Sequence, residues 1–283
     1  MTALSQALAG VRGLVLDADG VIVLKGELLP GAQEALARLM TQGIPFRIVT
    51  NFSAAHRETL SRRFANGAVP PTRFITAASA AATYTATHHP GGRIYAISSP
   101  DGLREFDGQA LVSADEADAA APGELAAVVI GDGGDELSYR NLDVAFRAIR
   151  RGAAFIAMHR NPWWLTPRGE TLDAGAFVAG LEFATGRAPV ICGKPSAVVF
   201  RQAVVDLAAD LGVDRLSAAD VAMVGDDPEA DIGGARRAGL RGILVLTGKV
   251  DAAAAAVAMA GPARTRPTAI AASLPEVVAA LGD

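Results

Sequence analysis

The stretch LVLDADGV at residues 14–21 joins a short apolar run to two carboxylates and a glycine. Apolar, β-branched runs of this length, bounded by turn residues, are typical of buried strands. The run ends at Asp17, and Gly20 favours a turn immediately after it. We therefore predict a buried strand that leads directly into a tight turn carrying Asp17 and Asp19.

The same arrangement recurs further along the chain, where other strand-like runs also end in polar residues. Helical patterns alternate with these runs, which predicts an α/β fold with a parallel sheet. In an open α/β sheet, ligands bind beyond the carboxyl ends of the strands, so these polar residues converge if their strands are neighbours. The runs and the residues that follow them are Phe46–Val49 with Thr50 and Asn51, Val190–Cys192 with Lys194, and Val221–Val224 with Asp226 and Asp227.

The spacing of these runs predicts two domains. The stretch between Asn51 and Lys194 is far longer than one crossover helix needs, and it contains its own strand and helix patterns. We expect a Rossmann-like, doubly wound parallel sheet in a core domain of residues 1–77 and 189–283. Residues 78–188 are predicted to form an inserted α/β cap domain that covers the sheet edge.

Composition excludes several classes of protein. Hydrophobic residues make up 51% of the 283 residues, which supports a packed core, and 26 Lys+Arg against 30 Asp+Glu give a net charge of −4. This balance argues against a nucleic-acid-binding protein, and no apolar run is long enough to span a membrane. The single Cys192 and the lack of a targeting signal near Met1 lead us to expect a cytoplasmic protein.

Asp17 and Asp19 offer the chemistry of phosphoryl transfer. One carboxylate can attack phosphorus and form an aspartyl-phosphate, and the other can protonate the leaving oxygen and then activate water. A simpler interpretation, an Asp pair that only forms a turn, is equally consistent with these two residues in isolation.

The cluster of Asp226, Asp227 and Asp231 is typical of a Mg²⁺ site, because carboxylates suit a hard cation that also binds phosphate. Helix capping is the alternative, but capping needs only one Asp. Thr50 and Asn51 supply a hydroxyl, an amide and backbone N–H groups that can bind an anion, although either residue can also be an ordinary cap. Lys194 is suited to neutralise phosphate and carboxylate charge, with a solvent-facing lysine as the alternative.

The four clusters together, in this order, resemble the haloacid dehalogenase (HAD) superfamily of phosphohydrolases. The long insertion between the second and third clusters resembles subclass IIA, whose NagD-like and p-nitrophenylphosphatase-like members carry a large α/β cap. Residues 153–185 and 239–248 look most similar to the phospholysine phosphohistidine inorganic pyrophosphate phosphatases and their HAD-domain relatives. The matching motifs are Asp17 to Val21, Thr50-Asn51, Lys194, and Gly225 to Asp231.

The resemblance implies a role for each of these residues. Asp17 is expected to be the nucleophile and a Mg²⁺ ligand, and Asp19 the general acid and base, with its backbone carbonyl on the metal. Thr50, Asn51 and Lys194 are expected to bind the phosphoryl group, and Lys194 also to neutralise Asp17. Asp226 is expected to bind Mg²⁺, with Asp227 or Asp231 supporting it. The resemblance also implies a small phosphorylated substrate and a possible homodimer through the cap.

The sequence of one cap segment differs from that of the NagD-like enzymes that the chain resembles. Where NagD-like members carry Thr-Asn-Pro-Asp in the cap, residues 159–164 read His-Arg-Asn-Pro-Trp-Trp. We therefore do not transfer a NagD-type substrate to this chain. Trp163 and Trp164 either line a substrate pocket or pack in the cap core or at a dimer face, and His159 is more typical of a packed or exposed histidine than of a catalyst.

Three other functions remain open. A metal-independent dehalogenase would also use an aspartate nucleophile, but it would need neither Asp19 nor the Asp226 cluster. A receiver-like, phosphate-responsive module would be shorter and would lack the insertion. A non-catalytic HAD-fold protein that binds phosphate or a partner is the third alternative.

Overall fold

The computed structural model describes residues 2–65, 67–166 and 169–281, and the chain divides into two compact units. The first unit comprises Met1–Thr50, Leu60–Ile75 and Lys194–Asp283, and the second comprises Asn51–Thr59 and Thr76–Gly193. The predicted boundaries differ from this division chiefly at residues 51–59, which we expected in the first domain. Their hydrogen bonds to the second unit, described below, explain why they group with it.

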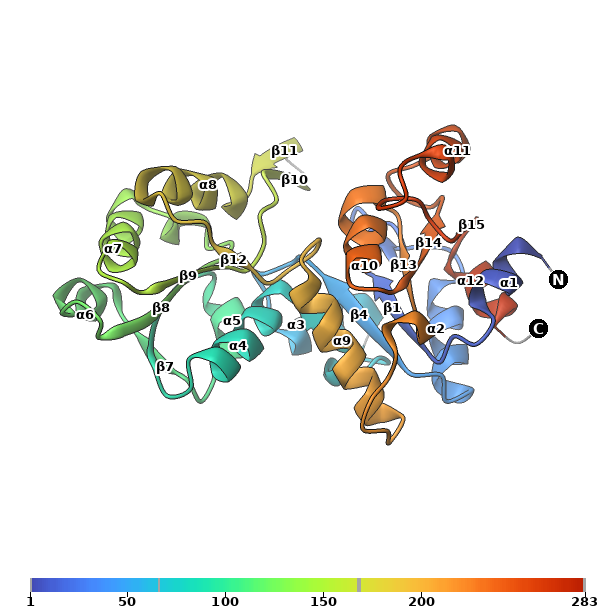
Figure 1. The fold of residues 1–283 in the computed structure, drawn as a ribbon, viewed down its shortest axis with the longest axis horizontal. Coiled ribbons are helices and arrows are strands. Elements are labelled where there is room, and N and C mark those ends of the chain that lie inside the picture. The colour runs from blue at the N-terminus through green and yellow to red at the C-terminus, as the bar shows by residue number, and fades with distance from the viewer. Residues whose placement is uncertain (1, 66, 167–168, 282–283) are drawn as a thin grey trace. The chain divides into compact units, whose positions relative to one another are not determined.

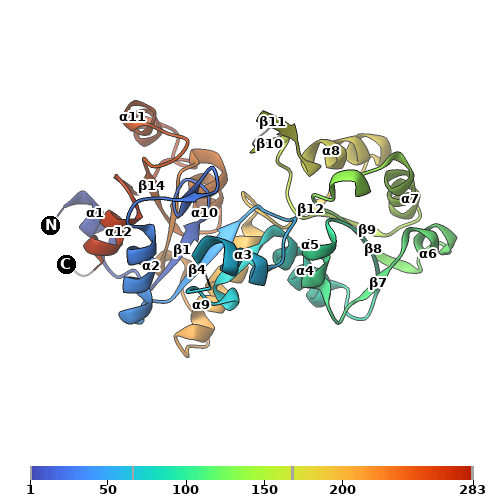
Figure 2. The same cartoon turned by 180° about the vertical axis from the view of Figure 1, so that it is seen from behind.

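The first unit is built on a six-stranded sheet in the order β15-β14-β13-β1-β4-β5. The strands from β15 through β4 pair in parallel. Helices α9 and α10 lie on the near face of this sheet in Figure 1, and α2 lies on the near face in Figure 2. The sheet is therefore covered by helices on both faces, as expected for a doubly wound fold.

The central strands are buried along their whole length, because both faces of the sheet are covered. Every residue of β1, β4 and β13 is buried, which is why these strands read as continuous apolar runs and not as alternating patterns. The elements of this unit, in chain order, are α1 (Ala3–Leu8), β1 (Gly13–Asp17), β2 (Val23–Leu24), β3 (Glu27–Leu28), α2 (Ala32–Thr41), β4 (Phe46–Thr50), α3 (Arg57–Ala65, which begins in the second unit), η1 (Pro71–Arg73), β5 (Phe74–Thr76), α9 (Ala197–Asp210), η4 (Ala218–Asp220), β13 (Val221–Gly225), η5 (Pro228–Gly233), α10 (Gly234–Arg237), β14 (Arg241–Val245), α11 (Ala252–Ala260), β15 (Ala269–Ala271) and α12 (Leu274–Ala280).

The second unit has its own five-stranded sheet, in the order β12-β9-β8-β6-β7, with parallel pairing throughout. Helices α7 and α8 lie on one face of this sheet and α4 and α5 on the other (Figures 1 and 2). The core between the sheet and α6, α7 and α8 is made by apolar side chains such as Val128, Phe155 and Val178. Its elements are α4 (Ala77–His88), β6 (Arg93–Ile97), α5 (Pro100–Leu103), η2 (Arg104–Phe106), β7 (Ala110–Val112), α6 (Ala114–Ala119), β8 (Leu125–Ile130), η3 (Gly134–Glu136), α7 (Tyr139–Arg150), β9 (Ala154–Ala157), β10 (Trp163–Thr166), β11 (Gly169–Leu172), α8 (Ala174–Thr185) and β12 (Val190–Ile191).

One strand belongs to a different sheet from the one we expected. The expected boundaries place the run before Lys194 in the core domain, where it could lie beside the strands that end at Asp17, Thr50 and Asp226. It forms β12, which pairs with β9 in the second unit. Lys194 itself belongs to the first unit, so it reaches the site from the connection between β12 and α9.

Among the helices that the structure describes, none is both long and apolar enough to cross a bilayer.

Candidate active site

The first residue of the site, Asp17, is the last residue of β1 and is only 7% exposed. Its Oδ1 accepts the backbone N–H of Ala18 at 2.7 Å and lies 2.5 Å from Nζ of Lys194. The turn after β1 therefore fixes one oxygen of this carboxylate against a buried cation.

Lys194 joins two carboxylates that come from different parts of the chain. Its side chain is 4% exposed, and its Nζ also lies 2.8 Å from Oδ1 of Asp231. Burial lowers the pKa of Lys194, but the charges of Asp17 and Asp231 outweigh that effect and hold the pKa above its usual value. Lys194 is therefore a charged ammonium group at neutral pH, buried between two acidic partners.

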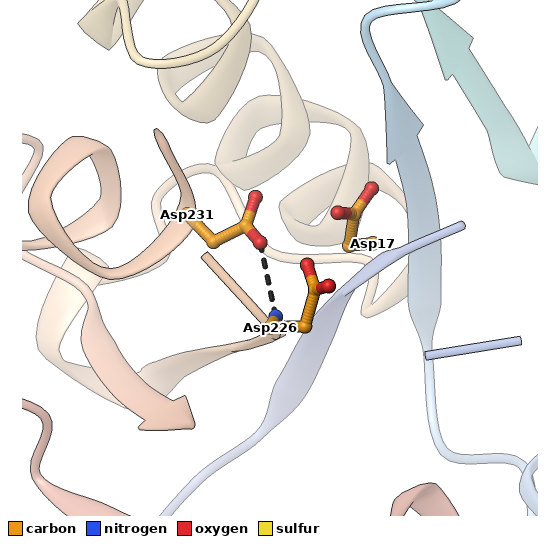
Figure 3. A group of neighbouring side chains, drawn as sticks. All are labelled: Asp17, Asp226 and Asp231. Carbon is orange, nitrogen blue, oxygen red and sulfur yellow. Dashed lines mark hydrogen bonds between the residues drawn. The ribbon is translucent and has the colours of Figure 1, made fainter. Parts of the chain in front are cut away.

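Asp226 and Asp231 complete the acidic cluster, which Figure 3 shows together with Asp17. Asp226 follows β13, and Asp231 lies in the helical turn η5. Oδ2 of Asp231 accepts the backbone N–H groups of Asp226 and Asp227, both at 3.1 Å. Because its Oδ1 lies against Nζ of Lys194, both carboxylate oxygens of Asp231 have a partner. Asp231 therefore orients the loop after β13.

Two glycines allow the backbone to approach Asp226 closely. A Cβ at Gly20, whose φ is +75°, would lie 2.2 Å from Oδ2 of Asp226, and a Cβ at Gly248 would lie 1.9 Å from the same oxygen. Any larger residue at either position would have to displace the carboxylate. The turn after β1 and the loop after β14 thus enclose Asp226 from two sides.

Asp227 and Lys249 form a pair next to this cluster. Oδ1 of Asp227 caps η5 by accepting the N–H groups of Glu229 and Ala230, both at 2.9 Å, and Oδ2 lies 2.7 Å from Nζ of Lys249. Burial raises the pKa of Asp227, but Lys249 and the capping N–H groups outweigh this and lower it. The helix-capping interpretation is therefore correct for Asp227.

Burial and mutual repulsion control the protonation of the remaining carboxyl groups. Burial, followed by the charge of Asp231, raises the pKa of Asp17 well above its ordinary value and that of Asp226 to about 6. Asp19 is open to solvent on one side, yet the surrounding protein desolvates its carboxyl group and raises its pKa, against the opposing effects of Lys194 and Lys249. Asp19 is therefore the carboxyl group here that combines a raised pKa with access to solvent.

The three clustered carboxylates fit a hard divalent cation. One ligand atom each from Asp17, Asp226 and Asp231 lie within 4.8 Å of one another, and all three residues are buried. Three buried carboxylates against the single ammonium group of Lys194 leave an excess of negative charge, which a divalent cation would offset.

Thr50 and Asn51 are adjacent in sequence but belong to different units. Thr50 ends β4 and is 3% exposed, next to the end of β1, where Asp17 pairs with Val49. The side-chain amide of Asn51 donates to Oδ1 of Asn161 at 3.2 Å within the second unit.

Sequence analysis missed the contribution of the loop after β14. The Thr247 hydroxyl donates to the carbonyl of Gly20 at 2.5 Å, and the backbone N–H of Lys249 donates to Oδ2 of Asp226 at 2.8 Å. The signal was present, because the run Ile243–Leu246 is also a strand that ends in polar residues.

The three residues that the sequence singled out in the cap, His159, Trp163 and Trp164, differ in how exposed their side chains are. His159 is 2% exposed and hydrogen-bonded, so it is a packed histidine, whereas Trp163 and Trp164 on β10 are 53% and 37% exposed. The Trp164 ring lies edge-on to Phe52, with 6.1 Å between ring centroids. The two tryptophans are therefore not core residues of the second unit.

Comparison with known proteins gives two matching family models. The model described as haloacid dehalogenase-like hydrolase matches residues 14–111, and the HAD-hydrolase-like model matches residues 191–277. The chain is 32% identical over 256 residues to the phospholysine phosphohistidine inorganic pyrophosphate phosphatase of Bos taurus, covering 88% of each protein.

Two of the solved structures that share this fold are named as phosphatases. The p-nitrophenyl phosphatase from Archaeoglobus fulgidus superposes with a TM-score of 0.82 at 27% identity, covering 96% of this chain and 99% of that one. The glycerol phosphate phosphatase from Mycobacterium tuberculosis, solved in complex with magnesium, has a TM-score of 0.78 at 27% identity. The match covers 98% of this chain and 78% of that one.

Proposed function

Since this chain belongs to the haloacid dehalogenase-like hydrolase family, we propose that it is a Mg²⁺-dependent phosphatase that acts on a small phosphorylated metabolite through an aspartyl-phosphate intermediate. The observation that carries the proposal is the buried cluster of Asp17, Asp226 and Asp231, in which Lys194 lies between Asp17 and Asp231. Relatives named as phosphatases support the reaction class, and a magnesium complex of one similar structure supports the choice of metal.

In the first step, a carboxylate oxygen of Asp17 attacks phosphorus while the bond from phosphorus to the leaving oxygen breaks. The carboxylic acid of Asp19 gives its proton to that oxygen, so the leaving group departs as a neutral alcohol. The raised pKa of Asp19 favours the protonated form that this step requires.

In the second step, the Asp19 carboxylate accepts a proton from water as the water oxygen attacks the phosphorus of the aspartyl-phosphate. The acyl phosphate P–O bond breaks, which releases inorganic phosphate and restores the Asp17 carboxylate. Both carboxyl groups then return to their starting protonation states.

The residues around the reacting phosphoryl group position it and neutralise its charge. Lys194 carries the fixed positive charge, and Thr50 and Asn51 supply hydrogen-bond donors. Asp17, Asp226 and the backbone carbonyl of Asp19 would hold Mg²⁺, and Asp231 would support the loop that carries Asp226. When bound, Mg²⁺ neutralises phosphoryl charge and stabilises the ionised carboxylates.

Asp17→Asn tests this proposal. The variant should lose p-nitrophenyl phosphate turnover in Mg²⁺ buffer, because an amide cannot form the acyl phosphate. The wild-type enzyme should lose activity in EDTA and regain it with excess Mg²⁺. Wild-type rates in Asp17→Asn would reject the nucleophile, and chloride release from a haloacid without metal would favour the dehalogenase alternative.

Location in the cytoplasm and pairing of two copies through the second unit remain predictions from the sequence. Cys192 is buried, and burial raises the pKa of its thiol to about 12.

A further inference from the structure

A buried polar cluster in the second unit has no part in the chemistry proposed above. Ser53, His159 and Asp173 are 1%, 2% and 5% exposed. Nε2 of His159 lies 3.0 Å from the hydroxyl oxygen of Ser53 and 3.6 Å from Oδ1 of Asp173. Buried polar groups carry a free-energy cost unless they are paired, so a cluster of this kind fixes the segments that contribute to it.

The contacts determine which ring nitrogen of His159 carries the proton. The backbone N–H of Asn161 donates to Nδ1 at 3.3 Å, so Nδ1 is the acceptor and Nε2 bears the hydrogen. Burial lowers the pKa of His159 to about 4, so the ring is neutral at pH 7. Nε2–H therefore donates to Ser53, whose hydroxyl oxygen also accepts the N–H of Asp132 at 3.0 Å.

Ser53 belongs to the short segment 51–59, which follows Thr50 directly and packs against α5. The carbonyl of Ser53 accepts the Ser98 hydroxyl at 3.2 Å, and the carbonyl of Ala54 accepts the Ser99 hydroxyl at 2.6 Å. A Cβ at Gly102 would lie 2.3 Å from the Ser53 carbonyl oxygen. The backbone of this segment is thus held by hydrogen bonds and by close packing.

The residues after β9 hold this segment at two points. Nε2 of His159 is hydrogen-bonded to the hydroxyl of Ser53. Two residues later, Oδ1 of Asn161 accepts a hydrogen bond from the side-chain amide of Asn51. Only Asn51 and Phe52 separate Ser53 from Thr50, and each trans peptide spans a fixed ~3.8 Å between Cα atoms. A displacement of Ser53 is therefore transmitted to Thr50 and Asn51 unless the intervening dihedrals absorb it.

We propose that Ser53 and His159 are positioning residues for the phosphate-binding pair Thr50 and Asn51. The inference rests on the proposed function, because it assumes that these two residues bind the phosphoryl group. His159 does not contact the reacting atoms in this scheme. It holds the backbone from which the phosphate-binding groups project.

Two substitutions at one position separate this role from a general structural one. In His159→Gln, the side-chain amide can reach the place of Nε2 and donate to Ser53. In His159→Asn, the shorter side chain can replace the Nδ1 acceptor but loses the contact with Ser53. We expect His159→Asn to raise the KM for p-nitrophenyl phosphate and the inhibition constant of inorganic phosphate about tenfold, and His159→Gln to stay within about twofold of wild type.

Thr85→Val is the matched control, because Thr85 is a buried residue of the same unit whose hydroxyl binds Gln109 and not the 51–59 segment. It should lose stability without a change in KM. Hydrogen exchange in residues 51–59 should speed up in His159→Asn and in Ser53→Ala, but not in Thr85→Val.

The outcomes distinguish the two proposals. A wild-type protein that neither hydrolyses p-nitrophenyl phosphate nor binds inorganic phosphate would overturn the proposed function and, with it, this inference. An active wild type whose His159→Asn variant keeps the wild-type KM and phosphate inhibition would overturn the inference alone. Equal KM changes in His159→Asn and Thr85→Val would overturn it too.

Discussion

Lys194 is the residue on which the charge balance of the acidic cluster depends. It is the buried cation between Asp17 and Asp231, at 2.5 Å and 2.8 Å. Removing one partner of a buried ion pair leaves uncompensated charge, which costs more than the pair itself contributes.

Lys194→Met should therefore lower the free energy of unfolding by about 3–5 kcal/mol at pH 7 without metal. The loss should be smaller near pH 5, because the raised pKa of Asp17 lets that carboxyl group take up a proton in the folded variant. Urea unfolding at the two pH values measures both effects. A loss that is equal at both would contradict the charge argument.

Asp173 makes the pH dependence of stability testable at a site far in sequence from the acidic cluster. Burial raises its pKa from the ordinary 3.8 to about 6, so the folded protein binds this proton more tightly than the unfolded chain. The proton on Asp173 therefore contributes to the free energy of unfolding. This contribution is complete below about pH 4 and is lost as the pH rises through 6.

Asp173→Asn removes this dependence while keeping an acceptor that can cap α8. The unfolding free energy of wild type minus that of the variant should fall by up to about 3 kcal/mol between about pH 4 and pH 7.5. The lowered pKa of His159 has the opposite effect on stability, and because its Nε2 lies 3.6 Å from Oδ1 of Asp173, the same comparison in a His159→Gln background separates the two groups. A difference that is constant with pH would show that Asp173 is not perturbed by burial.

At the scale of elements, the site is assembled from the ends of β1, β4, β13 and β14 and from the start of the α9 connection. The loop after β14 contributes through its backbone, since Gly248 packs against Asp226 and the N–H of Lys249 binds the same carboxylate. A loop that works through its backbone is hard to recognise from side-chain motifs.

Gly248→Ala should move the Asp226 carboxylate, because the added Cβ would lie 1.9 Å from Oδ2. We expect the Mg²⁺ concentration for half-maximal activity to rise at least tenfold, a change of about 1.4 kcal/mol in binding. Gly180→Ala is the control, because Gly180 lies in α8 with no atom within 4 Å of an added Cβ. It should add about 0.5–1 kcal/mol of stability and leave the metal response unchanged. Equal metal responses in both variants would refute the packing argument.

At the scale of the whole molecule, the chain passes between its two units four times, after residues 50, 59, 75 and 193. Two of these passages lie next to residues of the proposed site, one directly after Thr50 and one directly before Lys194. The acidic cluster, however, lies entirely within the first unit. Metal binding should therefore stabilise that unit specifically.

We expect Mg²⁺ at a hundred times its dissociation constant to stabilise the first unit by about 2.7 kcal/mol. Calorimetry with and without EDTA measures the shift in melting temperature, and Asp226→Asn should show little or none. If the units melt separately, only one transition should move. A Mg²⁺ shift in Asp226→Asn equal to that of wild type would place the metal elsewhere.

Local sequence patterns were enough to predict the central strands of the first unit, the alternation of strands and helices, and the polar residues at the strand ends. These features depend on local runs of apolar and turn-forming residues, which are visible in a short window. The expectation that Asp17 and Asp226 lie close together followed from one general rule, that parallel strands share an edge.

Three features could not be predicted from local patterns and required the folded structure: β12 pairs with β9 in the second unit, segment 51–59 packs against α5, and Asp231 contacts Lys194 while Asp227 pairs with Lys249. The folded structure also decided that Gly248 closes over Asp226. Each of these depends on which distant segments meet, and a short window of sequence does not contain that information. Two aspartates four residues apart have the same local preferences, and the fold alone determines which one faces a buried lysine and which one caps a helix.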